Sequence, residues 1–178
     1  MRAEAVLSEP ASGRTREDEA TAAVTDLYRG HALGLTRLAL MMVGDRATAE
    51  DVVQEAFLGL YRRWANVEDR TKALTYVRSS VLNGCRTALR RRHRPLRAVH
   101  VPPVWSAEAQ ALVGEERGEV MAALHRLPVR QREALVLRYF AELGEAEIAE
   151  AMGVSRGTVK STTSRALAAL GRILEARS

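Results

Sequence analysis

The stretch AEIAEAMGVSRGTVKSTTSRALAAL, residues 146–170, decides the fold of the 178-residue chain. Its apolar residues recur with a helical period on both sides of Gly153. Ala149 is small enough for two helices to cross closely, and Val159 can pack the second helix against the first. Because the glycine permits a turn with positive φ and Ser155 can cap the following helix, the spacing predicts a helix-turn-helix.

The second helix of this motif presents polar side chains on its outer face. The residues that its period turns inward are Val159, Thr163, Ala166, Leu167 and Leu170. With the cap Ser155, the outer residues predicted to contact DNA are Arg156, Thr158, Lys160, Ser161, Ser164 and Arg165. These side chains carry donors suited to phosphate oxygens and base edges, whereas the alternative is a plain helical hairpin with a solvated, hydroxyl-rich face.

Helical periodicity continues through most of the chain before this motif, with no convincing strand alternation and no internal repeat. One helix is expected to end at Gly44, a second to begin near Asp45, and a third to run from about Lys72 to Arg92. These three helices predict a first domain over residues 21–94. Residues 1–20 are acidic and lack an apolar segment, so we expect a disordered N-terminal extension.

A proline-containing stretch, residues 95–111, separates this domain from the helix-turn-helix and predicts a linker. Beyond it we expect a helix over 112–125, a second from Pro128 to near Ala141, and two short helices to the C-terminus. The predicted fold class is therefore all-α: two small helical domains joined by a linker, with the helix-turn-helix in the C-terminal domain, residues 112–178.

The positive charge is concentrated in two segments. The chain has 27 Lys and Arg against 22 Asp and Glu, which gives a net charge of +5. Residues 73–98 contain seven arginines and no acidic residue, and the last 28 residues carry a net charge of +4. Two basic blocks on a globular chain indicate two nucleic-acid-facing surfaces, the alternative being a pair of solvated arginine-rich helices.

Several classes of protein find no support in the sequence. A single cysteine, Cys85, excludes an internal disulfide framework and a multi-cysteine metal site, and indicates a reducing compartment. Scattered histidines and the lack of a phosphate-binding glycine loop predict no catalytic residues, no metal and no cofactor, hence no enzyme. The longest apolar run, Leu38 to Val43, is far shorter than the roughly 20 residues of a membrane span.

Two polar faces precede the linker. On the predicted second helix, an acidic face should meet a protein rather than a phosphate backbone, unless it is merely solvated. Its residues are Asp51, Gln54, Glu55 and Leu58. On the third helix a polar stripe could follow one DNA strand; it consists of Asn83, Arg86, Arg90 and Arg94. Near it Trp64 and Tyr76 could stack on an unpaired base or could simply fill the core.

Four stretches together resemble an RNA polymerase sigma factor of the extracytoplasmic-function group, closest to its SigE-like branch in actinobacteria. They are GDRATAEDVVQEAFLGLYRRW (44–64), YVRSSVLNGCRTALRRR (76–92), LPVRQREALVLRYF (127–140) and AEIAEAMGVSRGTVKSTTSRALAAL (146–170). The resemblance covers about residues 22–175 in the family's order and spacing. It implies that the two domains correspond to the family's regions 2 and 4.

The resemblance also implies partners for each surface. The acidic face, Asp51, Gln54, Glu55 and Leu58, would dock on the β′ clamp helices of core RNA polymerase, and the second domain on the β flap. The loop from Val67 to Lys72 and the third helix would open and read the minus-10 element through Asp69, Arg70, Lys72, Tyr76, Asn83, Arg86 and Arg90. The outer face of the helix-turn-helix would read the minus-35 element of promoter DNA. An anti-sigma factor is a further candidate partner, and the expected location is the cytoplasm.

Two other functions compete with this interpretation. A free-standing regulator would use the C-terminal module on DNA and the N-terminal domain for dimerisation, which requires a palindromic site. An adaptor that binds acidic or nucleic-acid partners without promoter selectivity is disfavoured by the specific helix-turn-helix spacing.

Overall fold

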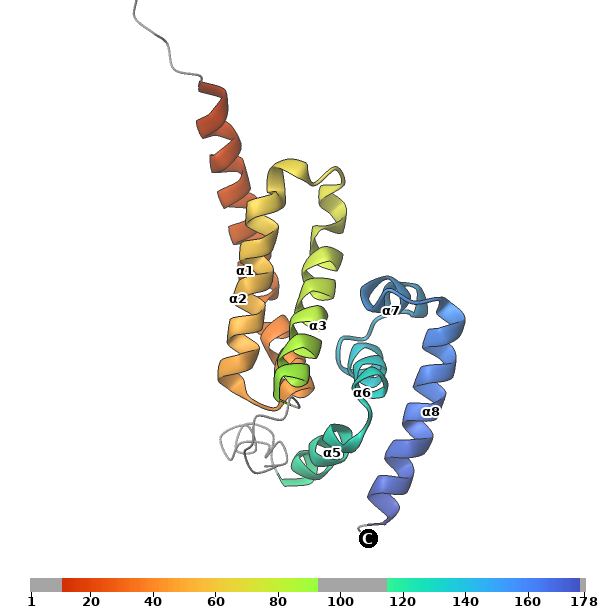
Figure 1. Cartoon of the computed structure of the whole chain (residues 1–178). Helices are drawn as coiled ribbons and strands as arrows, with labels where there is room; N and C mark the ends of the chain where they lie inside the picture. Colours follow the sequence, from red (N-terminus) through yellow and green to blue (C-terminus); the bar gives the residue numbers. More distant parts are fainter. Residues whose placement is uncertain (1–10, 93–114, 177–178) are drawn as a thin grey trace, which may run out of the picture.

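The computed structural model describes residues 11–92 and 115–176, and the regular structure in these ranges is helical throughout (Figure 1). The predicted all-α fold of two helical domains is confirmed. The predicted linker, residues 95–111, lies outside the described residues, as does Arg94.

Three helices form the first domain: α1 (Ala11–Val43), α2 (Arg46–Arg63) and α3 (Ala73–Arg92). Apolar residues from all three fill its core. The turn between α1 and α2 is fixed at both ends, because Gly44 adopts φ +76° and the Asp45 carboxylate accepts a hydrogen bond from the Thr48 amide at 3.1 Å. Arg92, at the end of α3, pairs with the same carboxylate at 2.8 Å, which ties the third helix to the start of the second.

The N-terminal extension differs from the prediction. Residues 11–20 are not disordered but form the first turns of α1, which project beyond the rest of the domain (Figure 1). Adding residues to an existing helix avoids the cost of nucleation, so a packed helix can propagate into a polar segment. Glu19 also pairs with Arg70 at 3.4 Å, which anchors these turns to the loop before α3.

The second domain contains α5 (Glu115–Arg126), α6 (Val129–Leu135), a π-helical continuation η3 (Val136–Phe140), α7 (Glu145–Met152) and α8 (Arg156–Glu175). The predicted helix-turn-helix is confirmed: Gly153 ends α7 at φ +65°, the Ser155 hydroxyl caps α8 by accepting from the Thr158 amide at 3.1 Å, and Val159 is buried. The last helix is twenty residues long and not short as predicted.

One predicted inward position on α8 is wrong. Leu167 is 43% exposed, whereas Thr162 is buried in its place on the inner face. The inner face of α8, which packs against α5, α6 and α7, is narrower than a periodicity count suggests.

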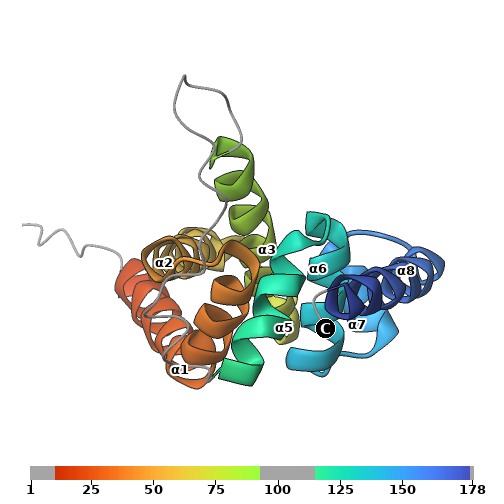
Figure 2. The same ribbon diagram turned by 90° about the horizontal axis from the view of Figure 1, so that it is seen from below.

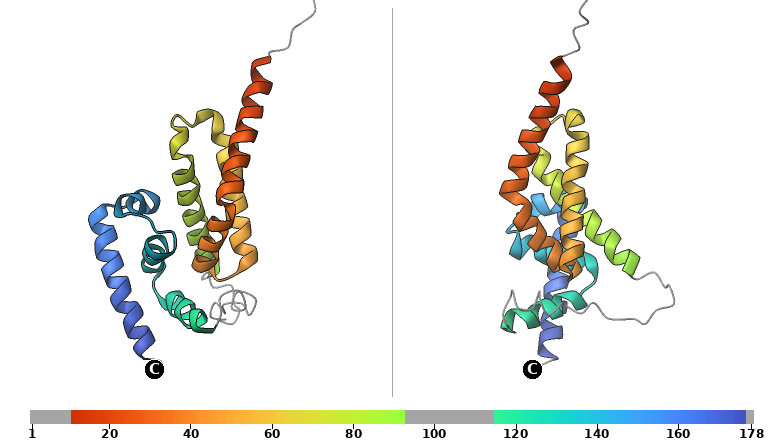
Figure 3. Two further views of the ribbon diagram at one scale, coloured as in Figure 1. Left: turned by 180° about the vertical axis from the view of Figure 1, so that it is seen from behind. Right: turned by 90° about the vertical axis from the view of Figure 1, so that its left-hand side faces the viewer.

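The two domains pack directly against each other. Helices α6 and α7 lie beside α3, and α8 lies on the far side of the second domain (Figures 2 and 3). Buried apolar residues of both domains, including Leu82 of α3 and Ile148 of α7, belong to one continuous core.

Candidate protein and nucleic-acid interfaces

The acidic face of α2 is open to solvent. Asp51, Gln54, Glu55 and Leu58 are all exposed, and Leu58 keeps 45% of its surface accessible although it is a large apolar side chain. An exposed leucine beside two free carboxylates can add apolar contact to an electrostatic attraction. The structure therefore brings together the four residues predicted to bind a protein.

A groove next to this face was not predicted from the sequence. It has a volume of about 490 Å³ and runs between α1 and α2, lined by Val24, Tyr28, Gln54, Leu58 and Tyr61 among others. Tyr28 and Phe57 both line the groove, and their rings meet edge to face with centroids 5.0 Å apart. Only the alignment of α1 along α2 creates this groove, and the sequence gives no local signal for that alignment.

The loop before α3 is built around Trp64. Trp64 is buried and fills the core, so of the two interpretations of this residue the structure supports packing. The Arg70 guanidinium lies over its ring at 5.4 Å from the centroid, a cation–π arrangement that holds an exposed positive charge in place.

Asp69 shapes the same loop from the other side. Its carboxylate accepts a hydrogen bond from the Thr71 amide at 3.0 Å, which caps the short turn η2 (Arg70–Lys72). A hydrogen bond from the Thr71 hydroxyl, more than any other contact, lowers the pKa of the Asp69 carboxyl. Lys72 lies 3.7 Å from this carboxylate and is also exposed, whereas Tyr76 is half-buried at the start of α3.

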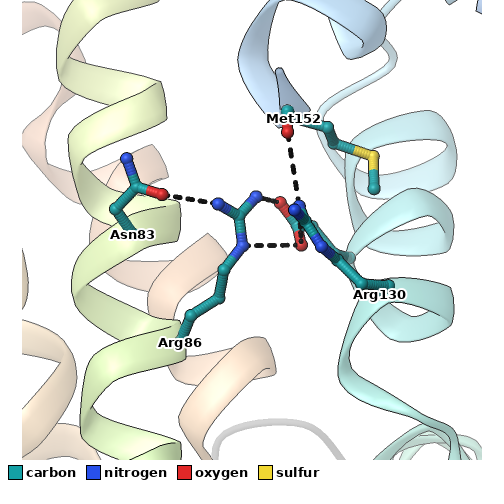
Figure 4. A network of polar contacts seen from close by, with 5 residues as sticks. Asn83, Arg86, Arg130 and Met152 are labelled. Carbon is teal, nitrogen blue, oxygen red and sulfur yellow. Dashed lines mark hydrogen bonds and ion pairs between the residues drawn. The ribbon is translucent and has the colours of Figure 1, made fainter. Parts of the chain in front are cut away.

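The predicted polar stripe of α3 is divided. Arg90 is exposed and donates to the Thr87 hydroxyl at 3.1 Å. Arg86 instead turns toward the second domain and forms an ion pair with Glu133 of α6, with Nε 3.1 Å from Oε2 (Figure 4). Asn83 is exposed, and its side-chain oxygen accepts a hydrogen bond from Arg86. In this arrangement Arg86 is not on a free surface.

The outer face of α8 is free along its first three turns. All seven predicted DNA-contacting residues are exposed: Ser155, Arg156, Thr158, Lys160, Ser161, Ser164 and Arg165. Arg165 donates to the Ser161 carbonyl at 3.2 Å, so its guanidinium is held against the helix. A hollow of about 330 Å³ beside Lys160 and Ser164 is bordered by Tyr139, which is 61% exposed.

Cys85 and the other metal-binding residue types form no site in the structure. Cys85 is fully buried, and burial raises the pKa of its thiol to about 12, which keeps it protonated and unreactive. Within residues 11–92 and 115–176 no three His, Cys, Asp or Glu side chains are grouped closely enough to hold a metal ion. Over the same ranges no helix has the length and apolar character that crossing a bilayer requires.

Comparison with known proteins identifies the family. Residues 27–95 match the model of Sigma-70 region 2, and residues 117–170 match that of Sigma-70, region 4. The RNA polymerase sigma-E factor of Streptomyces coelicolor is 36% identical over 147 residues, which cover 80% of this chain and 81% of that protein. The chain belongs to the extracytoplasmic-function (ECF) sigma factors.

Other relatives and solved structures agree with this assignment. The ECF sigma factor SigM of Mycobacterium tuberculosis is 34% identical over 154 residues, 85% of this chain and 77% of SigM. In fold, the sigma factor is similar to CnrH in its complex with the cytosolic domain of CnrY, with a TM-score of 0.68 and 23% identity over 92% of this chain and 99% of CnrH. It also resembles RpoE from Bartonella quintana, with a TM-score of 0.59 and 22% identity over 84% of this chain and 97% of that one.

Family membership gives the protein its activity and its main partners. As a sigma factor it binds core RNA polymerase and promoter DNA and directs promoter-specific initiation of transcription. Family matches span whole domains, so they do not assign roles to individual side chains.

Proposed function

We propose that the acidic face of α2 is the surface through which this sigma factor binds the β′ clamp helices of core polymerase. The residues concerned are Asp51, Gln54, Glu55 and Leu58. Their joint exposure on one helix face supports this role, because a carboxylate pair around an accessible leucine suits a basic, partly apolar partner helix. The second domain, whose residues 117–170 match Sigma-70, region 4, is the part proposed to contact the β flap.

The minus-10 element is the proposed ligand of the loop before α3 and of α3 itself. The residues that would contact it are Asp69, Arg70, Lys72, Tyr76, Asn83, Arg86 and Arg90. Exposed positive charge at Arg70 and Lys72, next to a half-buried tyrosine, suits a single strand whose phosphates need neutralising and whose bases need stacking.

The minus-35 element is the proposed ligand of α8. The observation that carries this assignment is the capped, exposed face of donor side chains between Ser155 and Arg165 on the second helix of a helix-turn-helix. The N-terminal turns of such a helix are the part that enters the major groove, where hydroxyl, lysine and arginine donors reach phosphates and base edges.

Residues 21–94 and 112–178 act as the region 2 and region 4 domains, joined by a linker over 95–111. The factor catalyses no reaction itself and acts in the cytoplasm, where polymerase meets DNA. RpoE, which shares this fold, was solved with the anti-sigma factor NepR, and we include an anti-sigma factor among the partners of this chain.

Reconstituted transcription tests the proposal. The purified chain alone should bind promoter DNA weakly, because each module offers few base contacts and only polymerase can hold the two modules at promoter spacing. With core polymerase it should give specific run-off transcripts and permanganate-reactive thymines near the minus-10 element. A tight, symmetric footprint by the chain alone, with neither melting nor transcripts on adding core, would replace this function by that of a free-standing regulator.

A further inference from the structure

The contact between the two domains is centred on a buried carboxylate. Glu133 on α6 has no accessible surface, yet it faces α3 of the other domain. Both of its oxygens are paired: Arg86 donates to each of them, and Arg130 lies 3.3 Å from Oε2. A buried carboxylate without such partners would be strongly destabilising, so the position of Glu133 depends on Arg86 of the opposite domain.

All three guanidinium nitrogens of Arg86 already donate within the structure. Two of its nitrogens donate to Glu133, and the third donates to the side-chain oxygen of Asn83 (Figure 4). Only 18% of the Arg86 side chain remains accessible. A planar guanidinium binds a carboxylate and a phosphate with the same donors, so Glu133 and a DNA phosphate compete directly for this residue.

Other contacts hold the same arrangement. Arg132, also buried, donates from Nη1 to the carbonyl oxygen of Met42 in the first domain at 2.7 Å. The His125 ring packs so closely on Gly44 that a β-carbon there would lie 3.0 Å from it. Together with the shared apolar core, these contacts define one closed packing of the two domains rather than a loose association.

We propose that this closed packing is an autoinhibitory state, in which Glu133 occupies Arg86 in place of promoter DNA and must release it before transcription can start. The inference rests on the proposed role of α3 at the minus-10 element. A chain that is mostly closed binds DNA with its intrinsic affinity reduced by the fraction that is open. Promoter binding in the complex with polymerase would then require the two domains to separate.

Removing the charge of Glu133 tests the contact. Glu133→Gln keeps the shape of the side chain but weakens its hold on Arg86, so the free chain should bind a fluorescein-labelled, mixed-sequence single-stranded oligonucleotide roughly tenfold or more tightly. The matched control is Glu150→Gln, which removes one exposed negative charge from α7 of the same domain. If both variants gained the same affinity for the oligonucleotide, the change in net charge alone would explain the effect, and the proposal would be overturned.

A distance measurement shows whether the domains separate. Spin labels at Ala65→Cys and Ala168→Cys, both exposed and on different domains, should report longer distances in Glu133→Gln than in the parent chain. The buried Cys85 should not compete for the label. Unchanged distances, or longer distances without a gain in DNA affinity, would each refute the inference.

A reversible cross-link tests the closed state without touching Glu133, in case that variant folds poorly. Thr87 and Val129 line a cavity of about 530 Å³ between α3 and α6, so Thr87→Cys and Val129→Cys can be joined by a reducible bis-maleimide reagent. The cross-linked chain should lose at least about tenfold of its run-off activity with core polymerase and regain it on reduction. Full activity while cross-linked would overturn the proposal.

Absence of transcripts with the unmodified chain would instead contradict the proposed function. The spin-label distances would still decide whether Glu133 holds the domains closed.

Discussion

Acidification should weaken the fold through His125, which lies on α5 against the turn at Gly44. Burial, with a smaller contribution from the Arg132 and Arg92 guanidinium groups, lowers the pKa of His125 from 6.5 to about 3. Arg132 donates from Nη1 to the Nδ1 atom at 2.6 Å, which requires that nitrogen to be unprotonated. In the folded chain the His125 imidazole is therefore held in its neutral form.

The sign and size of the effect follow from this shift. Between pH 6.5 and about 3 the unfolded chain takes up a proton on His125 that the folded chain does not. The free energy of unfolding thus falls as the pH falls below 6.5, with a limiting slope of about 1.4 kcal/mol per pH unit. Between about pH 7 and about pH 5 the loss should be about 2 kcal/mol.

Urea unfolding followed by circular dichroism at these two pH values measures the loss. His125→Asn retains an oxygen that can accept from Arg132 but removes the titration, so its stability should change about 2 kcal/mol less than that of the parent chain. His31→Asn, which removes an exposed histidine of α1, is the matched control and should behave like the parent. Asp45, whose carboxyl pKa the Thr48 hydroxyl lowers below 3.8, titrates outside this window. Equal pH dependence in His125→Asn and the parent chain would refute the reasoning.

Five substitutions test the acidic face of α2, the outer face of α8 and the cap of α8. Reversing the charge of Asp51 and Glu55 to lysine should weaken binding to core polymerase by roughly 2 to 5 kcal/mol in a pull-down, with an unchanged circular dichroism spectrum; full binding would leave this face merely solvated. Lys160→Ala and Arg165→Ala should each remove either a base contact or a phosphate contact. Loss of a base contact should cost about 1 to 3 kcal/mol of discrimination at the minus-35 element, whereas loss of a phosphate contact should lower the slope of log K against log salt concentration by about one unit. Binding to promoter variants distinguishes the two. Ser155→Ala removes the cap of α8 and should lower the free energy of unfolding by about 1 kcal/mol in urea titrations.

The helix-turn-helix could be predicted in detail because its signals are local. The positive φ of Gly153, the hydroxyl cap at Ser155 and the buried Val159 each follow from a residue type at a fixed offset within one supersecondary unit. The exposed face of α2 could be predicted from the sequence for the same reason. A helical period of 3.6 residues places Asp51 and Glu55 on one side of one helix. The roles of these faces stay predictions.

The relation between the two domains could not be predicted in this way. Glu133 lies in the short polar segment VRQREAL, which reads as a solvated helix, and nothing local indicates a partner 47 residues earlier in the chain. The sequence predicts a DNA contact for Arg86 because it belongs to a polar stripe with Asn83 and Arg90 on a basic helix. Its pairing is a tertiary contact between distant segments, which composition and periodicity do not encode. The helical start of α1 was missed for a similar reason, because its anchor is Arg70.

Arg86 takes part both in the ion pair with Glu133 and in the proposed contact with DNA. This determines which side chain can be substituted to remove inhibition without removing DNA binding. Removing Arg86 would delete the proposed phosphate contact and the closing contact together, so the two effects on DNA affinity would oppose each other. Glu133 is not among the residues proposed to contact DNA, since it lies on α6, where it pairs with Arg130 of its own helix and with Arg86 of α3. A buried ion pair is also a suitable closing contact, since the cost of desolvating its charges offsets much of their attraction and leaves a state that a competing anion can open. The carboxylate, and not the arginine, is therefore the position at which autoinhibition can be measured.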